Sequence, residues 1–184
     1  AWWGVLVNQV FTSVGGCQYL LDGGDEVLWI YDAFGGRQRL ALYPAAYGAA
    51  AAPLTATATL NQPFEVEVDT SAGYNEGEPP PSPRRSATPF AGAEVAPVIT
   101  AADGFQRVDV ASSSTVTTGV DGTASITFAQ PGWHRIKATD FSGGVESVVR
   151  SNRLDVCVPE PPAAGCGPPP ADAQPRTPPP LSPE

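Results

Sequence analysis

The chain has 184 residues, a formal net charge of -9, and only 16% charged residues. Nucleic acids and anionic membrane surfaces bind clusters of Lys and Arg, and the chain contains a single lysine, Lys137. The charge therefore excludes both from the predicted partners, and the length allows one domain or two small ones.

Residues 1–48 are expected to form a small unit of β structure. A strand is predicted over residues 5–8, and the Asp-Gly-Gly-Asp sequence at 22–25 indicates a turn, because glycine accepts the positive φ of tight hairpins. Residues 27–31 are apolar at every position, which is typical of a strand that is covered on both faces. One more strand is predicted over residues 37–43. So few strands make a thin core, and we therefore expect part of this unit to lie upstream.

Residues 54–158 are expected to form a second unit of β structure, after an alanine-rich linker at 49–53. Apolar and polar residues alternate along this segment, which is the period of a half-buried strand. Asp-Gly at 121–122 and Pro-Gly at 131–132 are turn signals between neighbouring strands. The predicted strands cover residues 64–69, 93–99, 105–110, 115–118, 124–128, 133–138, 145–149 and 154–158. Short strands at this spacing predict an all-β fold with a β-sandwich.

The cysteines and the proline-rich end of the chain indicate where the protein works. Residues 159–184 are rich in Pro, Ala and Gly and predict an extended, disordered tail. Cys157 and Cys166 are predicted to form a disulfide that fastens the last strand, and such a bond suits an oxidising compartment. We therefore expect a secreted or cell-surface, extracellular protein. Cys17 needs a partner outside this fragment or stays a free thiol.

Residues 2–34 combine three features: Val-Asn at 7–8 after an aromatic-rich strand, Gly-Asp-Glu-Val at 24–27, and Trp-Ile-Tyr at 29–31. In this combination the first unit resembles the second half of the transcobalamin-like C-terminal β-domain family. The resemblance implies a partial β-grasp-like fold, with the opening hairpin and helix of the family, and a partner for Cys17, upstream. In transcobalamin-like proteins the related domain caps a corrinoid, so the resemblance also implies small-ligand binding.

The second unit carries Gly-Ala-Glu-Val at 92–95, Asp-Gly-Thr-Ala-Ser-Ile-Thr-Phe at 121–128 and Pro-Gly-Trp-His-Arg-Ile-Lys-Ala at 131–138. These motifs resemble bacterial Ig-like domains of the invasin and adhesin kind, which implies an Ig-like β-sandwich over residues 54–158. Such domains usually place an inward tyrosine or other large residue where this chain has His134. Together the two units are similar to uncharacterised secreted or envelope proteins of actinobacteria.

Few residues offer catalytic or metal chemistry. His134 is the only histidine, no Gly-x-Ser-x-Gly elbow accompanies it, and strand alternation points it toward the core, so we predict structural packing and no enzyme activity. One histidine and three cysteines, two of them bridged, do not supply a zinc site. Carboxylates at Asp22, Asp25 and Glu26 suit calcium, but Asp-Gly turns are common for backbone reasons alone. No metal site and no cofactor are predicted.

Four tryptophans are the candidate ligand-binding residues: Trp2, Trp3, Trp29 and Trp133. Their rings could offer a platform to sugar rings or to a peptide. Aromatic residues also dominate ordinary β cores, and packing in the core or between domains is the favoured interpretation. Arg150 and Arg153 are interpreted as solvated loop charges.

These features predict a non-enzymatic structural or adhesion module with an Ig-like spacer and a proline-rich stalk. A cell-wall component, a glycan or another surface protein is the expected partner. Two alternatives stay open: a module that binds a corrinoid or a carbohydrate, and an accessory domain of a secreted enzyme. The long uncharged stretches at 1–21 and 40–64 contain polar residues, and the second also contains prolines, so neither is expected to insert into a membrane.

Overall fold

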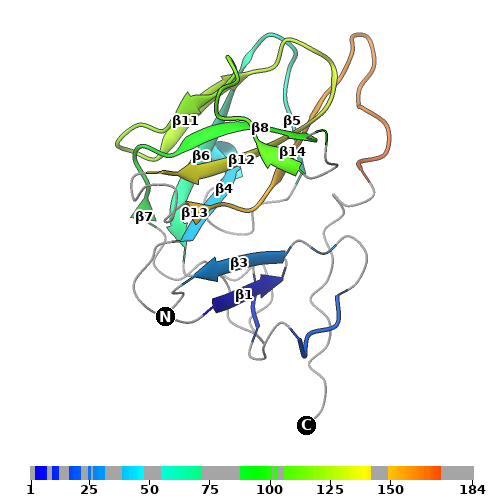
Figure 1. The fold of residues 1–184 in the computed structure, drawn as a ribbon. Coiled ribbons are helices and arrows are strands. Elements are labelled where there is room, and N and C mark those ends of the chain that lie inside the picture. The colour runs from blue at the N-terminus through cyan, green and yellow to red at the C-terminus, as the bar shows by residue number, and fades with distance from the viewer. Residues whose placement is uncertain are drawn as a thin grey trace.

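The computed structural model describes residues 3–7, 10–12, 17–21, 25, 27–31, 39–47, 55–71, 88–100, 102, 106–141 and 149–170. In this part of the chain the regular structure is β strand, apart from one 3-10 turn, η1 (Ala45–Tyr47). The strands form three sheets (Figure 1). The predicted all-β fold class is therefore confirmed.

The first sheet has three antiparallel strands, β1 (Trp3–Val7), β2 (Val10–Phe11) and β3 (Val27–Tyr31), with β1 in the centre. β1 pairs with β3 along its whole length. Consecutive residues of β1, from 5 to 7, are all buried, so both faces of this strand are covered. Two of the strands predicted for the first unit are thus present, and most of the predicted turn at 22–25 lies outside the described residues.

The second sheet is antiparallel and contains β4 (Arg39–Pro44), β6 (Pro63–Ser71), β7 (Thr88–Pro89) and β11 (Thr123–Thr127). β6 lies between β4 and β11, and β7 pairs with the end of β6. β4 is the strand predicted over 37–43, upstream of the predicted linker, and it pairs with β6 over all of its residues. The linker residues 49–53 lie outside the described part of the chain.

The third sheet is the largest and is curled like half a barrel. Its main path runs β10-β8-β12-β14-β5, with β9 paired to β8 and β13 paired to β12. All its pairings are antiparallel except that of β14 with β5, which is parallel. The strands are β5 (Thr55–Thr57), β8 (Glu94–Thr100), β9 (Gln106–Val108), β10 (Val116–Thr117), β12 (Gly132–Asp140), β13 (Val149–Arg150) and β14 (Leu154–Val158).

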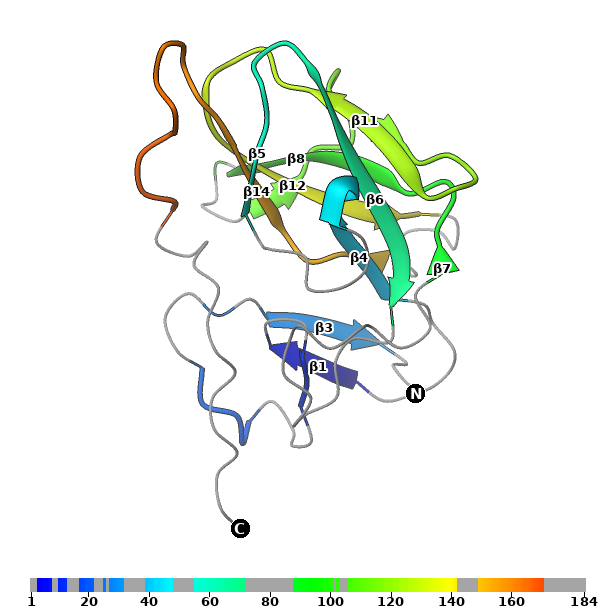
Figure 2. The same cartoon turned by 180° about the vertical axis from the view of Figure 1, so that it is seen from behind.

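One hydrophobic core joins the second and third sheets, which we call the two-sheet body. The second sheet contributes Leu42 and Val66, and the third contributes Ile136 and Leu154, all of them fully buried. Burial of each such side chain stabilises the fold by about 1.5–3 kcal/mol relative to exposure. Figure 2 shows the two sheets of the body facing each other, with the three-stranded sheet below them in both views.

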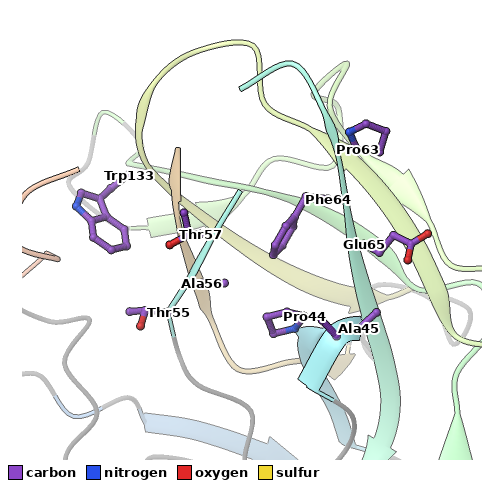
Figure 3. Close-up of a pocket in the computed structure, with 10 residues that line it drawn as sticks. Pro44, Ala45, Thr55, Ala56, Thr57, Pro63, Phe64, Glu65 and Trp133 are labelled. Carbon is purple, nitrogen blue, oxygen red and sulfur yellow. The ribbon is translucent and has the colours of Figure 1, made fainter. Parts of the chain in front are cut away.

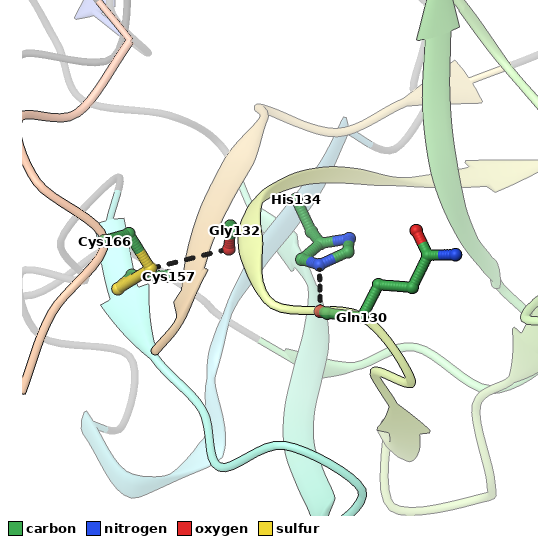
Figure 4. Close-up of a disulfide and its surroundings, with 5 residues drawn as sticks. All are labelled: Gln130, Gly132, His134, Cys157 and Cys166. Carbon is green, nitrogen blue, oxygen red and sulfur yellow. Dashed lines mark hydrogen bonds between the residues drawn. A yellow bond between two sulfur atoms is a disulfide. The ribbon is translucent and has the colours of Figure 1, made fainter. Parts of the chain in front are cut away.

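The last strand is covered on both faces, because every residue of β14 is buried. A disulfide joins Cys157, on the face of β14 that points away from the core, to Cys166, with their Cα atoms 5.7 Å apart. The bridge folds the start of the proline-rich tail back toward the sheet (Figure 4). The predicted disulfide is therefore present, and the described part of the tail, 159–170, contains no strand or helix.

Candidate functional site

An open groove of about 900 Å³ lies at the edge of the two-sheet body where β5 ends the third sheet (Figure 3). Its volume is in the range of about 300–1,000 Å³ that small-molecule sites occupy. We call it the β5 groove. It is lined by Pro44, Ala45, Ala46, Thr55, Ala56, Thr57, Pro63, Phe64, Glu65 and Trp133.

The pairing of β5 explains how the groove is divided. The N–H of Ala58 donates to the carbonyl of Cys157 at 2.8 Å, which fixes β5 against β14. Side chains alternate along a strand, so Ala56 turns into the core, where it is 9% exposed, while Thr55 and Thr57 face the other side. Figure 3 accordingly shows Trp133 on the threonine side of β5 and Phe64 on the core side.

Trp133 forms the aromatic wall on the outer side of the groove. It is directly opposite Cys157 in the β12–β14 pairing, so the disulfide lies beside it on the same face. The indole is half-buried, and its Nε1 atom is buried without a hydrogen-bond partner among the described residues. Figure 3 shows this nitrogen on the side of the ring away from Thr57, so the groove meets the carbocyclic part of the indole.

Phe64, near the start of β6, forms the opposite wall, and Figure 3 shows the carboxylate of the next residue, Glu65, turned away from the Phe64 ring. The Phe64 ring packs against the core, with its centroid 6.1 Å from that of Phe128. Glu65 is exposed, and it is the one charged residue among the described residues that line the groove. The lining therefore combines two aromatic rings, two hydroxyls and one carboxylate.

Of the three other predicted tryptophans, Trp29 is the one whose side chain the structure describes, and it does not lie at this groove. Trp29 is 55% exposed in the middle of β3, in the three-stranded sheet, and is not part of the groove lining. Trp3 begins β1 and is paired in register with Tyr31 of β3. Trp2 lies outside the described residues. Ligand binding by the four tryptophans stays a prediction, and of the two whose side chains the structure describes, Trp133 lines the groove and Trp29 does not.

His134 has structural contacts at the end of the core. Its Nε2–H donates to the carbonyl of Gln130 at 2.8 Å, as Figure 4 shows, and its ring centroid lies 4.9 Å from that of Phe128. The side chain is half-exposed at the rim of the core rather than fully inside it. Within the described residues no serine or carboxylate is hydrogen-bonded to this ring, so the contacts are those of a packed aromatic residue.

A buried polar cluster links β4 and β6 on the face away from the core. The Tyr43 hydroxyl donates to Asp69, and both side chains are almost fully buried. Burial, and then the neighbouring Asp69 carboxylate, raise the pKa of Tyr43 above its ordinary range. Burial and the charge of Asp69 likewise raise the pKa of Glu67, which is opposite Tyr43 in the strand pairing. The alternating pattern of β6 did not predict this cluster, because alternation places these carboxylates on the solvent-exposed face of a half-buried strand.

A second ionic cluster lies on the outer face of the third sheet. Arg135 and Asp155 are opposite each other on β12 and β14 and form a two-pronged pair, with N–O distances of 2.7 and 3.0 Å. Arg153 Nε lies 3.9 Å from the same carboxylate. The interpretation of Arg153 as a solvated loop charge is wrong, because its side chain is buried next to Asp155. Arg150, in contrast, is exposed.

In the part of the chain that the structure describes, no three His, Cys, Asp or Glu side chains are placed to hold a metal ion. Asp22 and Glu26, two of the carboxylates considered for calcium, lie outside that part. No helix among the described residues is long and apolar enough to cross a membrane.

No family model, curated protein or solved structure matches the chain.

Proposed function

We propose that this chain is a non-enzymatic structural and adhesion module that works outside the cell. The observation that carries the proposal is the disulfide between Cys157 and Cys166, which fastens the tail to the outermost face of the last strand. Stable disulfides of this kind belong to oxidising compartments such as the cell exterior. The proline-rich sequence after the bridge is of the kind found in semi-rigid spacers, which suits a stalk.

We further propose that the two-sheet body is an Ig-like sandwich that serves as a rigid spacer. Ig-like sandwiches consist of two sheets between which the chain crosses repeatedly, around a core of alternating inward residues. Here the chain passes from β4 to β5 and back to β6, and each step changes sheet. The common core of both sheets supports the same assignment. The transcobalamin-like assignment of the first unit rests on its sequence resemblance.

The proposal includes no enzyme activity because the described polar side chains are hydrogen-bonded to other parts of the fold. Tyr43 bonds to Asp69, Arg135 to Asp155, and His134 to a backbone carbonyl. Each of these contacts joins two strands or closes a turn, which is a structural use. Catalytic groups would have to converge on one open site, and the β5 groove has a single carboxylate among its described lining residues.

Binding of a small ligand is the second candidate, and the β5 groove is the observation that favours it. Its volume lies in the range of small-molecule sites, and its lining offers both aromatic rings and hydroxyl groups to a ligand. A module can be adhesive through such a groove, so the two candidates are compatible.

The test uses intact cells of the organism that makes the protein. Proteinase K added to unlysed cells is expected to remove the chain, and beads coated with the purified protein are expected to adhere to the same cells more than albumin-coated beads. Protection of the chain from the protease in intact cells would overturn the extracellular role. Turnover of any substrate in a hydrolase panel, lost in His134→Ala, would overturn the non-enzymatic role.

A further inference from the structure

The outer half of the β5 groove joins the indole of Trp133 to two hydroxyl groups. Trp133 supplies the aromatic surface, and Thr55 and Thr57 face the same side of β5 (Figure 3). A pyranose ring has the matching chemistry: a patch of C–H groups that packs on an aromatic face, and a rim of hydroxyls that donate and accept hydrogen bonds. Thr57 is exposed, so its hydroxyl is available at the surface.

Charge selects among the sugars that could enter. The chain has a net charge of -9, and Glu65 is the charged residue among the described lining residues. Uronic acids and phosphorylated polymers would be repelled by this carboxylate and by the overall field. A neutral sugar avoids that repulsion.

A disulfide and two prolines restrict the backbone in the walls of the groove. The disulfide beside Trp133 constrains the strand against which the indole rests. Pro44 and Pro63 stand on the other side, and proline fixes its own φ. A wall that is already ordered loses little conformational entropy when a ligand binds, which favours affinity.

We propose that the β5 groove binds a neutral, pyranose-based glycan, with one sugar ring packed on Trp133 and its hydroxyls bonded to Thr55 and Thr57. This proposal rests on the extracellular adhesion role and names the ligand class for it. An extended peptide that adds a strand to β5 is the competing occupant. β5 has only 3 residues, and such short edge strands are a known means of preventing strand addition, so the glycan is favoured.

Isothermal titration of the full chain with cellohexaose, chitohexaose and mannohexaose tests the proposal, with polygalacturonate as the anionic control. We expect at least one neutral oligosaccharide to bind and polygalacturonate not to bind. Trp133→Ala should weaken binding by about tenfold or more. Thr57→Val keeps the β-branched shape and removes the hydroxyl, and it should weaken binding by about threefold to tenfold.

Two further variants keep the test valid if Trp133→Ala unfolds. Trp133→Phe removes no hydrogen bond made within the described residues and keeps a smaller ring, so we expect a folded protein with intermediate affinity. Phe141→Ala is the matched control, because this exposed aromatic residue follows the far end of β12. It should bind like the unmodified chain.

Several outcomes would overturn the proposal. The first is that no neutral oligosaccharide binds at about 10 mM. The second is that the folded Trp133 and Thr57 variants bind the oligosaccharide with the same affinity as the unmodified chain. The third is that a Thr-Val repeat peptide binds and the sugars do not. Surface exposure in the protease experiment could still be found after each of these results. The failure of the glycan proposal is thus separable from a failure of the extracellular role.

Discussion

At the scale of single residues, one side-chain amide closes the open edge of β4. The N–H of Leu42 donates to Asn152 Oδ1 at 2.9 Å, and Asn152 Nδ2 donates back to the Leu42 carbonyl at 2.9 Å. The same Nδ2 also donates to the carbonyl of Arg153 at 3.0 Å. Asn152 therefore makes the hydrogen bonds to the backbone of β4 that a neighbouring strand would make, and it links the second sheet to the third.

Replacement of Asn152 by leucine should be strongly destabilising. It would leave the buried N–H and carbonyl of Leu42 unpaired, and each such loss costs about 1–3 kcal/mol. We expect the free energy of unfolding to fall by about 2–5 kcal/mol in urea denaturation. Gln62→Leu is the matched control, since this amide is exposed and should change stability by less than about 0.5 kcal/mol. Similar losses in both variants would contradict the role of Asn152.

Tyr43 should make the fold sensitive to alkaline pH. Burial raises its pKa in the folded state, so above about pH 10 the unfolded chain loses this proton first. The folded state then holds more protons than the unfolded state, and stability falls as the pH rises, by less than about 1.4 kcal/mol per pH unit. Below about pH 10 the tyrosine is protonated in both states and adds no slope.

Tyr43→Phe tests this dependence. The variant should be less stable at neutral pH, because Asp69 loses its hydrogen-bond donor. Its free energy of unfolding should, however, fall less steeply between about pH 9 and pH 11 than that of the unmodified chain. Parallel curves for the two proteins over this range would contradict a raised pKa for the buried phenol.

At the scale of elements, the turn before β11 is docked onto β6. Gly122 has φ of +75°, and its carbonyl accepts from the N–H of Val68 at 2.9 Å. A Cβ atom on Gly122 would lie 2.7 Å from the Val68 carbonyl oxygen and 3.0 Å from the Phe90 nitrogen. Both the conformation and the space at this position therefore require glycine.

Two glycine substitutions separate the cost of a positive φ from the cost of a steric overlap with the added Cβ atom. Gly92 also has a positive φ, of +85°, but nothing lies within 4 Å of an added Cβ. Gly92→Ala should cost about 1–2 kcal/mol, from the left-handed conformation alone. Gly122→Ala should cost more than about 3 kcal/mol, because backbone overlap is added. If thermal unfolding gives equal losses for the two variants, the close docking of this turn is wrong.

Strands with regular alternation were predictable from the sequence, whereas pairing over long distances was not. Ala124 and Ile126 alternate with polar residues and enter the core as predicted. β5 escaped prediction because it has only 3 residues and its partner, β14, lies about a hundred residues later. β4 was predicted as a strand, but only its pairing with β6 assigns it to the two-sheet body. Periodicity reports which face of a strand is buried, not which strand it pairs with.

The candidate site shows the same limit. Strand alternation was predicted to point His134 toward the core, which places its neighbour Trp133 on the opposite face of β12. The groove itself depends on β5, β6 and β12 meeting at one edge, which no local pattern encodes. The Tyr43–Asp69 cluster was missed for a related reason: the carboxylate lies on a face that looks wet from alternation and is covered in the folded chain.

At the scale of the whole molecule, a shared core and one covalent bridge fit the proposed role of this chain as a spacer. The two sheets of the body pack on each other through fully buried side chains from both. The Cys157–Cys166 loop should add about 2–3 kcal/mol by restricting the unfolded chain. Both features suit the proposed extracellular role.

The most direct measurement is the redox state of Cys157 and Cys166 in protein taken from the cells that produce it. Free thiols are blocked with iodoacetamide before lysis is complete, the protein is reduced and labelled with a second reagent, and the peptides are mapped by mass spectrometry. We predict that both cysteines carry only the second label, because they are bonded to each other in place. Iodoacetamide on both would mean a reducing compartment, and it would contradict the extracellular role on which the proposed function rests.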